Sequence, residues 1–401
     1  MQLLAQHGYG NGDKIERGLE EGLLDGVIFG AKDINPEKLA ATLERIDVEY
    51  PDSVRLLDPQ FYAAVIAAQP GARLGSLIGD GSHPYFEARR RRDLERNDQV
   101  SEDIFNVLNY QMSLPVTALI SPNIVVRRSF DSIEGTIAKT FLRNAAVATS
   151  AEGDARPIYA TLAVSATALS DKIELQNFLQ EITEMENPPD GFYLLLEKTD
   201  SSIASSLTEP DVLSRWMLMT HTLKLNGFLV INGYTDALSP YLAAAGSDAA
   251  ATGWYNTQKS FSLRKFEPVS DFARRPVQRY MSAALLKSIR YTELHDLRTR
   301  FPDVLNGLSF DECYDIEEGS APDSLTNEAL QNWQGINVMN MHAVDGDVYA
   351  SLENYRGALD EAEEIYGRIQ EYGLTMRDRS SAAHINAIRE ELDLFEELAE
   401  L

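Results

Sequence analysis

A chain of 401 residues is long enough for one large domain with an appendage, or for two domains. Its formal net charge of -26 at pH 7 opposes non-specific binding to nucleic acid or to an anionic membrane, and it favours solubility. The single cysteine, Cys313, excludes an internal disulfide bond and a cysteine-rich metal site. No N-terminal stretch has the form of a signal peptide, and no apolar run approaches ~18 residues. We therefore expect a cytoplasmic protein that does not enter a membrane.

Short apolar segments recur through the first 255 residues, and we expect each to form a strand. Three of them follow an Asp-Gly or Asn-Gly step, at Gly26, Gly191 and Gly227. Glycine has free access to positive φ and ends the preceding helix, after which the chain enters a strand that is apolar on both faces. This pattern is typical of a parallel sheet. The expected strands are 3–5, 27–29, 54–57, 115–120, 158–164, 192–196, 228–231 and 250–254.

Helical patterns separate these strands, and together they predict a (β/α)8 TIM-like barrel over residues 1–260. A long insertion at 68–100 interrupts the alternation. An open, doubly wound sheet is the alternative, because the first and eighth strands are short. The dinucleotide-binding pattern G-x-G-x-x-G is absent, and residues 8–12 resemble it only in being rich in glycine. The expected helices are 13–21, a segment beginning at Pro36, 102–112, 131–146, 171–185, 209–224 and 237–245.

Beyond the barrel we expect a C-terminal helical extension. Residues 261–318 form a connecting region that is partly helical, with a helix expected near 276–290. Residues 319–401 contain a polar linker and a helical hairpin, whose helices cover about 346–372 and 380–400. Apolar residues recur every 3 or 4 positions in both, so each helix has one apolar stripe. The hairpin packs either on its own barrel or on another subunit of a homo- or hetero-oligomer.

Parallel strands in a closed barrel place their C-terminal ends around one mouth, where catalytic residues gather. Asp58 and Glu197 each follow an apolar strand, and we predict them as a catalytic acid/base or nucleophile pair. His7 and Asp33 are their expected helpers. The alternatives are that Asp58 starts a turn at Pro59, and that Glu197 forms a salt bridge with Lys32 or Lys198.

A bound metal is possible but no metal ligand is assigned. His7, Asp33, Asp58 and Glu197 would together make a His/carboxylate cluster suited to a divalent cation such as Mg²⁺, Mn²⁺ or Zn²⁺. However, no second histidine falls at a strand end, and the spacings H-x-H and H-x-x-x-H do not occur. The cofactor therefore stays unknown.

Further polar and aromatic residues at the strand ends are candidates for binding a small polar or anionic substrate. Backbone N–H groups at Gly233, Gly246 and Gly253 could hold a phosphate, and aromatic rings could stack on a sugar or a nucleobase. The alternatives are a simple helix end at Gly246 and ordinary core aromatics under the loops. The predicted substrate-binding residues are Lys32, Gln60, Asn123, Asp200, Asn232, Tyr234, Trp254, Tyr255 and Lys259.

Four consecutive arginines, Arg89, Arg90, Arg91 and Arg92, lie in the long insertion. They could contact nucleic acid or an acidic partner, although the net charge disfavours nucleic acid. Acidic residues are interleaved with them at i,i+4-type spacing, so a solvated helix with internal ion pairs is the favoured interpretation.

The first functional hypothesis is a carboxylate-based hydrolase or transferase that acts on a polar sugar-, nucleotide- or nucleoside-like substrate, cleaving a glycosidic or N-glycosidic bond at the barrel mouth. The alternative is a non-catalytic barrel subunit that recognises a protein or RNA partner and assembles through its C-terminal helices. The first rests largely on the fold, since most barrels of this kind are enzymes.

Overall fold

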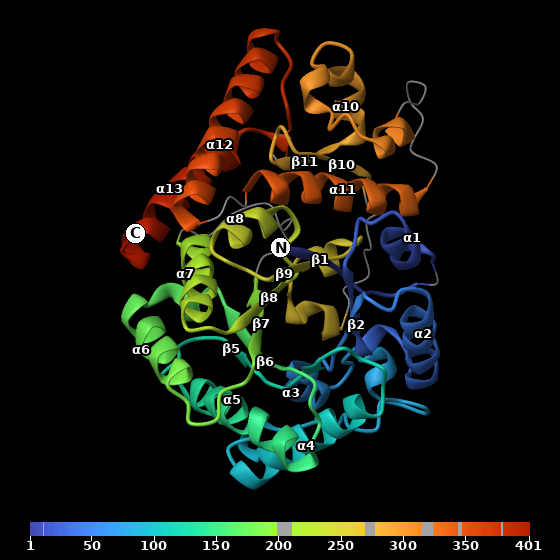
Figure 1. Ribbon diagram of the computed structural model, residues 1–401, viewed down its shortest axis with the longest axis vertical. Coiled ribbons are helices and arrows are strands. Elements are labelled where there is room, and N and C mark those ends of the chain that lie inside the picture. The colour runs from blue at the N-terminus through green and yellow to red at the C-terminus, as the bar shows by residue number, and fades with distance from the viewer. Residues whose placement is uncertain (11, 199–210, 269–276, 315–323, 344–346, 378–379) are drawn as a thin grey trace.

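Eight parallel strands form a barrel in the computed structural model of the chain (Figure 1). The described residues are 1–10, 12–198, 211–268, 277–314, 324–343, 347–377 and 380–401. Neighbouring strands follow the order β3-β2-β1-β9-β8-β7-β6-β4, and the short strand β5 (Val125–Val126) pairs with β6 as well. The barrel strands are β1 (Gln2–Gln6), β2 (Gly26–Gly30), β3 (Val54–Asp58), β4 (Leu119–Ile120), β6 (Ile158–Ser165), β7 (Gly191–Glu197), β8 (Leu229–Gly233) and β9 (Ala249–Thr252).

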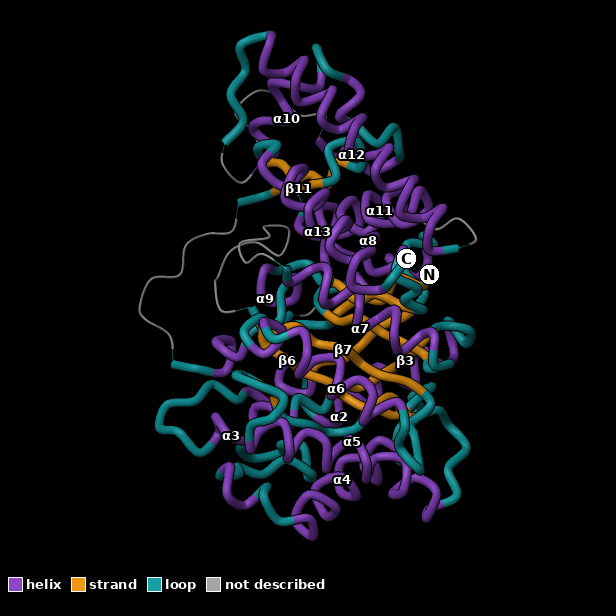
Figure 2. Tube along the Cα trace, turned by 90° about the vertical axis from the view of Figure 1, so that its left-hand side faces the viewer, coloured by secondary structure: helices purple, strands orange, loops and turns teal. Residues whose placement is uncertain are grey.

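Helices cover the outside of the barrel, as the alternating pattern predicts (Figure 2). They are α1 (Lys14–Glu20), α2 (Pro36–Glu49), α4 (Asn97–Met112), α5 (Ile133–Glu152), α6 (Lys172–Thr183), α7 (Val212–Leu225) and α8 (Ser239–Ala244). Helix α2 shows how local sequence sets these elements. Asn35 caps it by accepting a hydrogen bond from the Lys38 N–H, Pro36 occupies its first turn, and Leu39, Leu43 and Ile46 face the core.

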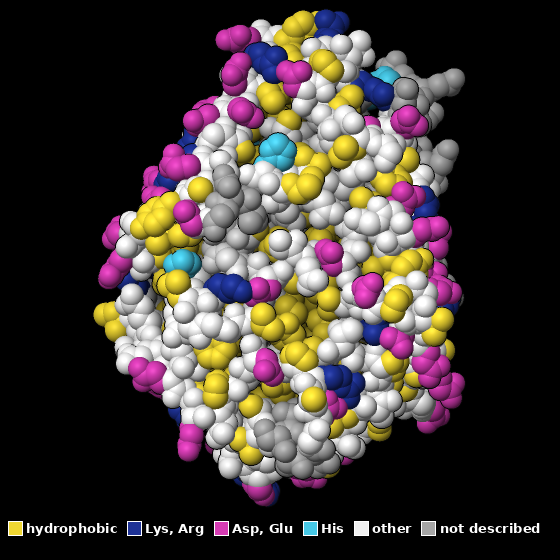
Figure 3. Space-filling view, in the orientation of Figure 1, with side chains coloured by type: hydrophobic (Ala, Val, Ile, Leu, Met, Phe, Trp, Pro, Cys, Tyr) yellow, Lys and Arg dark blue, Asp and Glu magenta, His cyan; other side chains and the backbone are white. Residues whose placement is uncertain are grey.

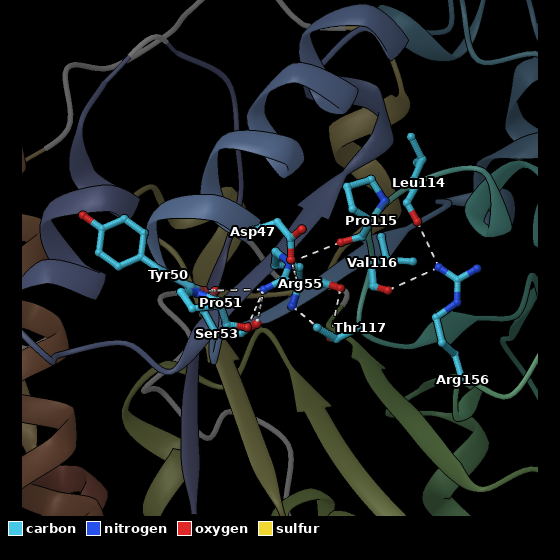
Figure 4. A network of polar contacts seen from close by, with 10 residues as sticks. All are labelled: Asp47, Tyr50, Pro51, Ser53, Arg55, Leu114, Pro115, Val116, Thr117 and Arg156. Atoms are coloured by element: carbon cyan, nitrogen blue, oxygen red, sulfur yellow. Dashed lines mark hydrogen bonds and ion pairs between the residues drawn. The ribbon is translucent and has the colours of Figure 1, made fainter.

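The barrel closes between β3 and β4, where the two strands share little backbone pairing. The side chain of Arg55 and its hydrogen-bond partners strengthen this seam (Figure 4). The Thr117 N–H donates to the Arg55 carbonyl at 2.8 Å, and the Arg55 N–H donates to the Thr117 hydroxyl at 3.0 Å. The buried Arg55 guanidinium donates to Pro115 O across the seam at 3.2 Å and pairs with Asp47 at 2.5 Å. It also donates to the Ser53 carbonyl at 2.9 Å, so one side chain satisfies polar groups on both sides of the seam.

The predicted strand at 115–120 is shorter in the structure, where β4 contains only Leu119 and Ile120. Pro115 and Pro122 flank it, and proline has no N–H to give to a sheet. Arg156, at the start of β6, donates to the carbonyls of Leu114 and Val116 at 2.9 and 3.3 Å. Side-chain donors thus take the place of some of the backbone hydrogen bonds that a longer β4 would form.

The predicted helix at 276–290 is wrong. This segment forms an antiparallel hairpin of β10 (Arg279–Ser282) and β11 (Lys287–Arg290), followed by α10 (Tyr291–Arg298). The residues of the hairpin turn, 283–286, have a high intrinsic preference for helix. Contacts with residues distant in sequence override this preference. Both backbone groups of Met281 bond to the Gln331 side chain, at 2.8 and 2.9 Å.

Gln331 belongs to α11 (Leu325–Ala343), a helix that the sequence analysis did not predict. Its buried Trp333 donates to the carbonyl of Thr252 at the end of β9, at 3.2 Å. The helix therefore joins the extension to the barrel.

The helical hairpin predicted for the C-terminus is confirmed as α12 (Val348–Glu371) and α13 (Ala383–Ala399). It packs on its own barrel. Glu391 of α13 accepts a hydrogen bond from the Ser214 N–H of α7 at 2.8 Å, and the rings of His221 and Phe395 lie 5.7 Å apart. Assembly with another subunit stays a prediction.

Acidic side chains are spread around the outline of the face shown in Figure 3, in keeping with the net charge. Within the described part of the chain, no helix combines the length and the apolar character needed to cross a membrane.

We expect Arg55→Met to lower the free energy of unfolding by about 2–4 kcal/mol, because several buried carbonyl groups and Asp47 lose their donor. Urea denaturation measures the change. Arg92→Met is the matched control, since the Arg92 side chain is exposed and should alter stability by less than about 0.5 kcal/mol. Equal effects of both substitutions would contradict a role for Arg55 in closing the seam.

Candidate active site at the barrel mouth

Asp58 is the last residue of β3 and is fully buried at the barrel mouth. Its carboxylate accepts hydrogen bonds from the Gln60 N–H at 2.9 Å and the Tyr62 hydroxyl at 2.8 Å. This N–H closes a short turn onto the Asp58 side chain, and Gln60 itself adopts a left-handed conformation with φ of 52°. Burial raises the pKa of Asp58, and these hydrogen bonds and the nearby Lys265 oppose the rise. Asp58 therefore accepts the hydrogen bond that closes the predicted turn at Pro59 and also has a raised pKa.

Three tyrosines surround this carboxyl group. The Tyr193 hydroxyl of β7 donates to Gln6 Oε1 of β1 at 3.1 Å. Strands β8 and β9 separate β1 from β7 in the sheet, so this bond crosses the barrel interior. Burial holds the pKa values of Tyr62, Tyr193 and Tyr234 well above their usual range, so all three remain neutral hydrogen-bond donors at pH 7.

Lys265 supplies a cationic group to the same mouth. Its Nζ donates to the Tyr234 hydroxyl at 2.8 Å and lies 4.7 Å from the centroid of that ring. Burial lowers the pKa of Lys265 to about 8, against the opposing fields of Asp58 and Asp33. An amine with this pKa can donate or accept a proton near neutral pH.

Sequence reasoning missed Lys265 because it lies beyond the predicted barrel boundary. It belongs to a short 3-10 helix, Leu263–Phe266, in the segment that follows β9. The sequence feature that could have identified Lys265 is its position among the apolar residues Phe261, Leu263 and Phe266.

The segment 260–266 covers the mouth. Phe261 and Phe266 are buried, and the Lys198 N–H donates to the Phe261 carbonyl at 3.0 Å. The Leu263 N–H approaches Glu197 Oε1 at 3.4 Å. These contacts fasten the segment to the end of β7.

Backbone strain gathers at the same strand ends. Besides Gln60, both Tyr234 and Asp236 have left-handed φ angles, 58° and 46°, directly after β8. Such conformations are costly for residues other than glycine and are often found at functional sites. The buried Asp236 carboxylate accepts no hydrogen bond from the described residues, and its Oδ1 lies 3.5 Å from Lys259 Nζ.

A cavity of about 420 Å³ opens at the ends of β1, β2 and β9. His7 borders it, with its ring 5.0 Å from Phe29 and 6.2 Å from Trp254, centroid to centroid. Burial lowers the pKa of His7 to about 4, so its imidazole is neutral at pH 7. The remaining lining residues are Tyr9, Gly10, Gly12, Asp13, Lys14, Ile15, Glu16, Ile34, Lys38, Thr42, Arg45, Ile46 and Tyr255.

Glu197 is not part of the Asp58 cluster. It rims the mouth, as expected from its place at the end of β7, but Arg127 binds both of its oxygens at 2.9 and 3.2 Å. Glu197 therefore forms a salt bridge, and its partner is Arg127. The predicted partners were Lys32 and Lys198, of which Lys32 pairs with Asp33. The bidentate contact occupies both oxygens of the Glu197 carboxylate and fixes its orientation.

Asn123 and Asn232 have structural roles. The Asn123 amide donates to the Thr161 carbonyl at 2.7 Å, between strands. The Asn232 carbonyl oxygen accepts from the Trp216 indole at 2.6 Å, and its amide donates to Ser247 at 2.9 Å. Both side chains are buried in these networks, which leaves them poorly placed to contact a substrate.

The remaining predicted site residues divide between the mouth and other places. Lys32 and Asp33 are half-buried and lie 3.6 Å apart at the mouth. Gln60 and Tyr234 belong to the Asp58 cluster, whereas Trp254 and Tyr255 border the His7 cavity. Asp200 lies outside the described residues.

The arginine run in the insertion forms ion pairs, as the favoured interpretation predicts, but the expected solvated helix is wrong. Only Arg91–Asp93 form a short 3-10 turn, and the Arg89 side chain is mostly buried. Arg89 binds the buried Asp103 at 2.8 Å, Arg91 lies 3.9 Å from Glu95, and Arg92 lies 3.8 Å from Asp93. A contact with nucleic acid stays a prediction.

The predicted His/carboxylate cluster does not assemble. Within the described ranges, no group of three or more His, Cys, Asp or Glu side chains is placed to hold a metal ion. Asp58 instead accepts hydrogen bonds from Tyr62 and the Gln60 N–H, and Glu197 binds Arg127.

No family model and no curated protein matches this sequence. Among solved structures, a monomeric variant of dihydrodipicolinate synthase is 12% identical over 84% of this chain and 97% of its own, with a TM-score of 0.33. The dihydrodipicolinate synthase from Oceanobacillus iheyensis is 10% identical over 100% of this chain and 97% of its own, with a TM-score of 0.24. At these values the two structures are distant neighbours, and they carry no information about the residues at this mouth.

We expect the stability of the wild type to rise relative to that of Lys265→Met as the pH increases from about 8 towards 10.5. Because burial lowers the pKa of Lys265, the folded state binds fewer protons than the unfolded state within this window. Urea denaturation at several pH values measures the difference between the two proteins. A difference that does not change with pH would contradict the lowered pKa of Lys265.

Proposed function

We propose that the protein is an enzyme that performs acid–base chemistry on a small polar substrate at the barrel mouth. Asp58 and Lys265 are the proposed proton-transfer groups. The observation that carries this proposal is Lys265, whose ammonium group lies over aromatic rings beside the buried Asp58 and has a pKa of about 8.

Opposite pKa shifts make these two groups suitable partners. Burial raises the pKa of Asp58 and lowers that of Lys265, so both move towards neutral pH. At pH 7, roughly a tenth of Lys265 is the neutral amine, given its pKa of about 8. The ammonium form can protonate a leaving group or stabilise a developing negative charge, and the neutral form can accept a proton.

The tyrosines around this pair would position the substrate. Tyr62 and Tyr193 stay protonated, and because their hydroxyl protons are given to Asp58 and Gln6, their oxygens can accept hydrogen bonds from a substrate. Tyr234 holds the Lys265 amine in place through its hydroxyl. These groups come from three different loops or strands, as is typical of barrel enzymes.

A hydrolase or transferase mechanism with Asp58 and Glu197 as its two carboxylates has less support. The bidentate contact with Arg127 neutralises Glu197 and fixes its orientation. Proton transfer to a leaving group is common to hydrolases and transferases, so the proposed reaction class does not require a second carboxylate.

Substrate access requires the covering segment to move. Asp58 is fully buried, and the buried rings of Phe261 and Phe266 pack against Tyr62 of the Asp58 cluster. Loops that close over a barrel mouth exclude water and complete the site when substrate binds. A non-catalytic barrel subunit would have a covered mouth as well. The covering segment therefore supports both hypotheses equally.

Incubation with a cellular metabolite extract, followed by mass spectrometry, tests the proposal without a known substrate. We expect the wild type to consume at least one small polar metabolite. Asp58→Asn should lower the rate roughly 100- to 10,000-fold, the range for loss of a general acid or base. Lys265→Met should lower it by a similar factor.

Glu197→Gln is the control, and we expect it to keep most of the activity because Glu197 is already neutralised by Arg127. A larger loss in Glu197→Gln than in Asp58→Asn would restore the carboxylate-pair mechanism. Turnover that is equal in the wild type, Asp58→Asn and Lys265→Met would overturn the proposal. Absence of any turnover would favour the partner-binding barrel.

A further inference from the structure

We infer that the cavity beside His7 and Trp254, here called the His7–Trp254 pocket, binds a small planar molecule that carries an acidic group. The inference goes beyond the proposed function and does not rest on it. The binding itself is independent of Asp58 and Lys265, neither of which lines the pocket.

Aromatic rings make the pocket suitable for a planar ligand. Trp254 is half-buried and meets His7 edge-on, with an interplanar angle of 86°. Phe29 and Tyr255 also line the pocket. Its volume of about 420 Å³ falls within the usual size range of small-molecule sites. A flat ring could therefore stack on Trp254 while it fills the cavity.

Cationic side chains give the pocket a charge opposite to that of the whole protein. Lys14, Lys38 and Arg45 line it together with Asp13 and Glu16, so cations outnumber carboxylates in a chain whose formal net charge is -26. Glu16 pairs with Arg45, whereas Lys14 forms no ion pair with a described residue. Its Nζ lies 5.7 Å from the centroid of Trp254. An acidic group on a ring stacked at Trp254 would be close to this ammonium.

His7 adds a hydrogen-bonding group to the wall of the pocket. Its Nδ1 is buried and has no hydrogen-bond partner among the described residues. Buried polar atoms are nearly always satisfied, so an unpartnered one beside a cavity points to a ligand or an ordered water. Burial keeps the pKa of His7 near 4, so a neutral imidazole offers one donor and one acceptor.

The pocket adjoins the proposed proton-transfer groups. The negative charge of Asp33 raises the pKa values of both His7 and Lys265, so its carboxylate lies within electrostatic reach of each. Gly30, at the end of β2, also lies between the two regions. A Cβ there would lie 2.8 Å from the Gln60 side chain and 3.5 Å from the His7 carbonyl. A ligand in the pocket would therefore reach towards the Asp58 cluster.

Isothermal titration calorimetry with four probes tests the inference: adenosine 5′-monophosphate, uridine 5′-monophosphate, adenosine and inorganic phosphate. We expect at least one mononucleotide to bind with one-to-one stoichiometry and at least tenfold more tightly than adenosine or phosphate. Lys14→Met should weaken mononucleotide binding about tenfold and leave adenosine binding unchanged. Trp254→Leu should weaken both.

Lys172→Met is the matched control, because Lys172 is exposed at the start of α6 and does not line the pocket. Lack of mononucleotide binding, or equal binding to the wild type and Lys14→Met, would overturn the inference. Trp254 also contacts Trp333, so Lys14→Met keeps the test valid if Trp254→Leu fails to fold.

Asp58→Asn separates this inference from the proposed function. Mononucleotide binding that depends on Lys14, without turnover that depends on Asp58, would support the pocket and contradict the proposed enzyme. Turnover that depends on Asp58, without mononucleotide binding, would support the enzyme and contradict the pocket.

Discussion

Closure of the barrel between β3 and β4 is the constraint on which the rest of the structure depends. The two strands share little backbone pairing, and the buried Arg55 guanidinium joins the two sides of this seam. Arg55 lies near the start of β3, and Asp58 ends the same strand. Pairing with β2 sets the register of β3 and places Asp58 opposite Gly30. The contacts that close the barrel at one end of β3 therefore also position the carboxyl group at the other end.

Desolvation determines the chemistry of the mouth. The covering segment removes water from Asp58 and Lys265 and shifts their pKa values in opposite directions, because burial disfavours the charged form of each. The surrounding tyrosines stay neutral for the same reason. The left-handed conformations of Gln60 and Tyr234 show that the backbone accepts strain to hold these groups in place. The mouth is covered, its backbone is strained, and its ionisable groups are poorly solvated. These are the physical properties expected of the proposed proton-transfer site.

The sequence predicts the barrel well because strands buried on both faces leave a clear apolar signal, and Asp58 follows from its place at a strand end. It does not predict Lys265, which reaches the mouth from a loop beyond the last strand. Nor does it predict the pairing of Glu197 with Arg127, because that contact joins segments 70 residues apart. The hairpin β10–β11 was mistaken for a helix because local propensity favoured helix, while the contacts with α11 that decide the outcome are distant in sequence.

The most direct test of this account is an NMR titration of Lys265 with ¹⁵N-labelled lysine side chains, in which Lys265→Met identifies the resonance. The account predicts a pKa of about 8, which falls further in Asp58→Asn because the Asp58 carboxylate favours the ammonium form. A pKa near the ordinary lysine value of about 10.4 in both proteins would contradict it. That result would mean that Lys265 is a solvated surface lysine, and the barrel mouth would lose its proposed acid–base pair.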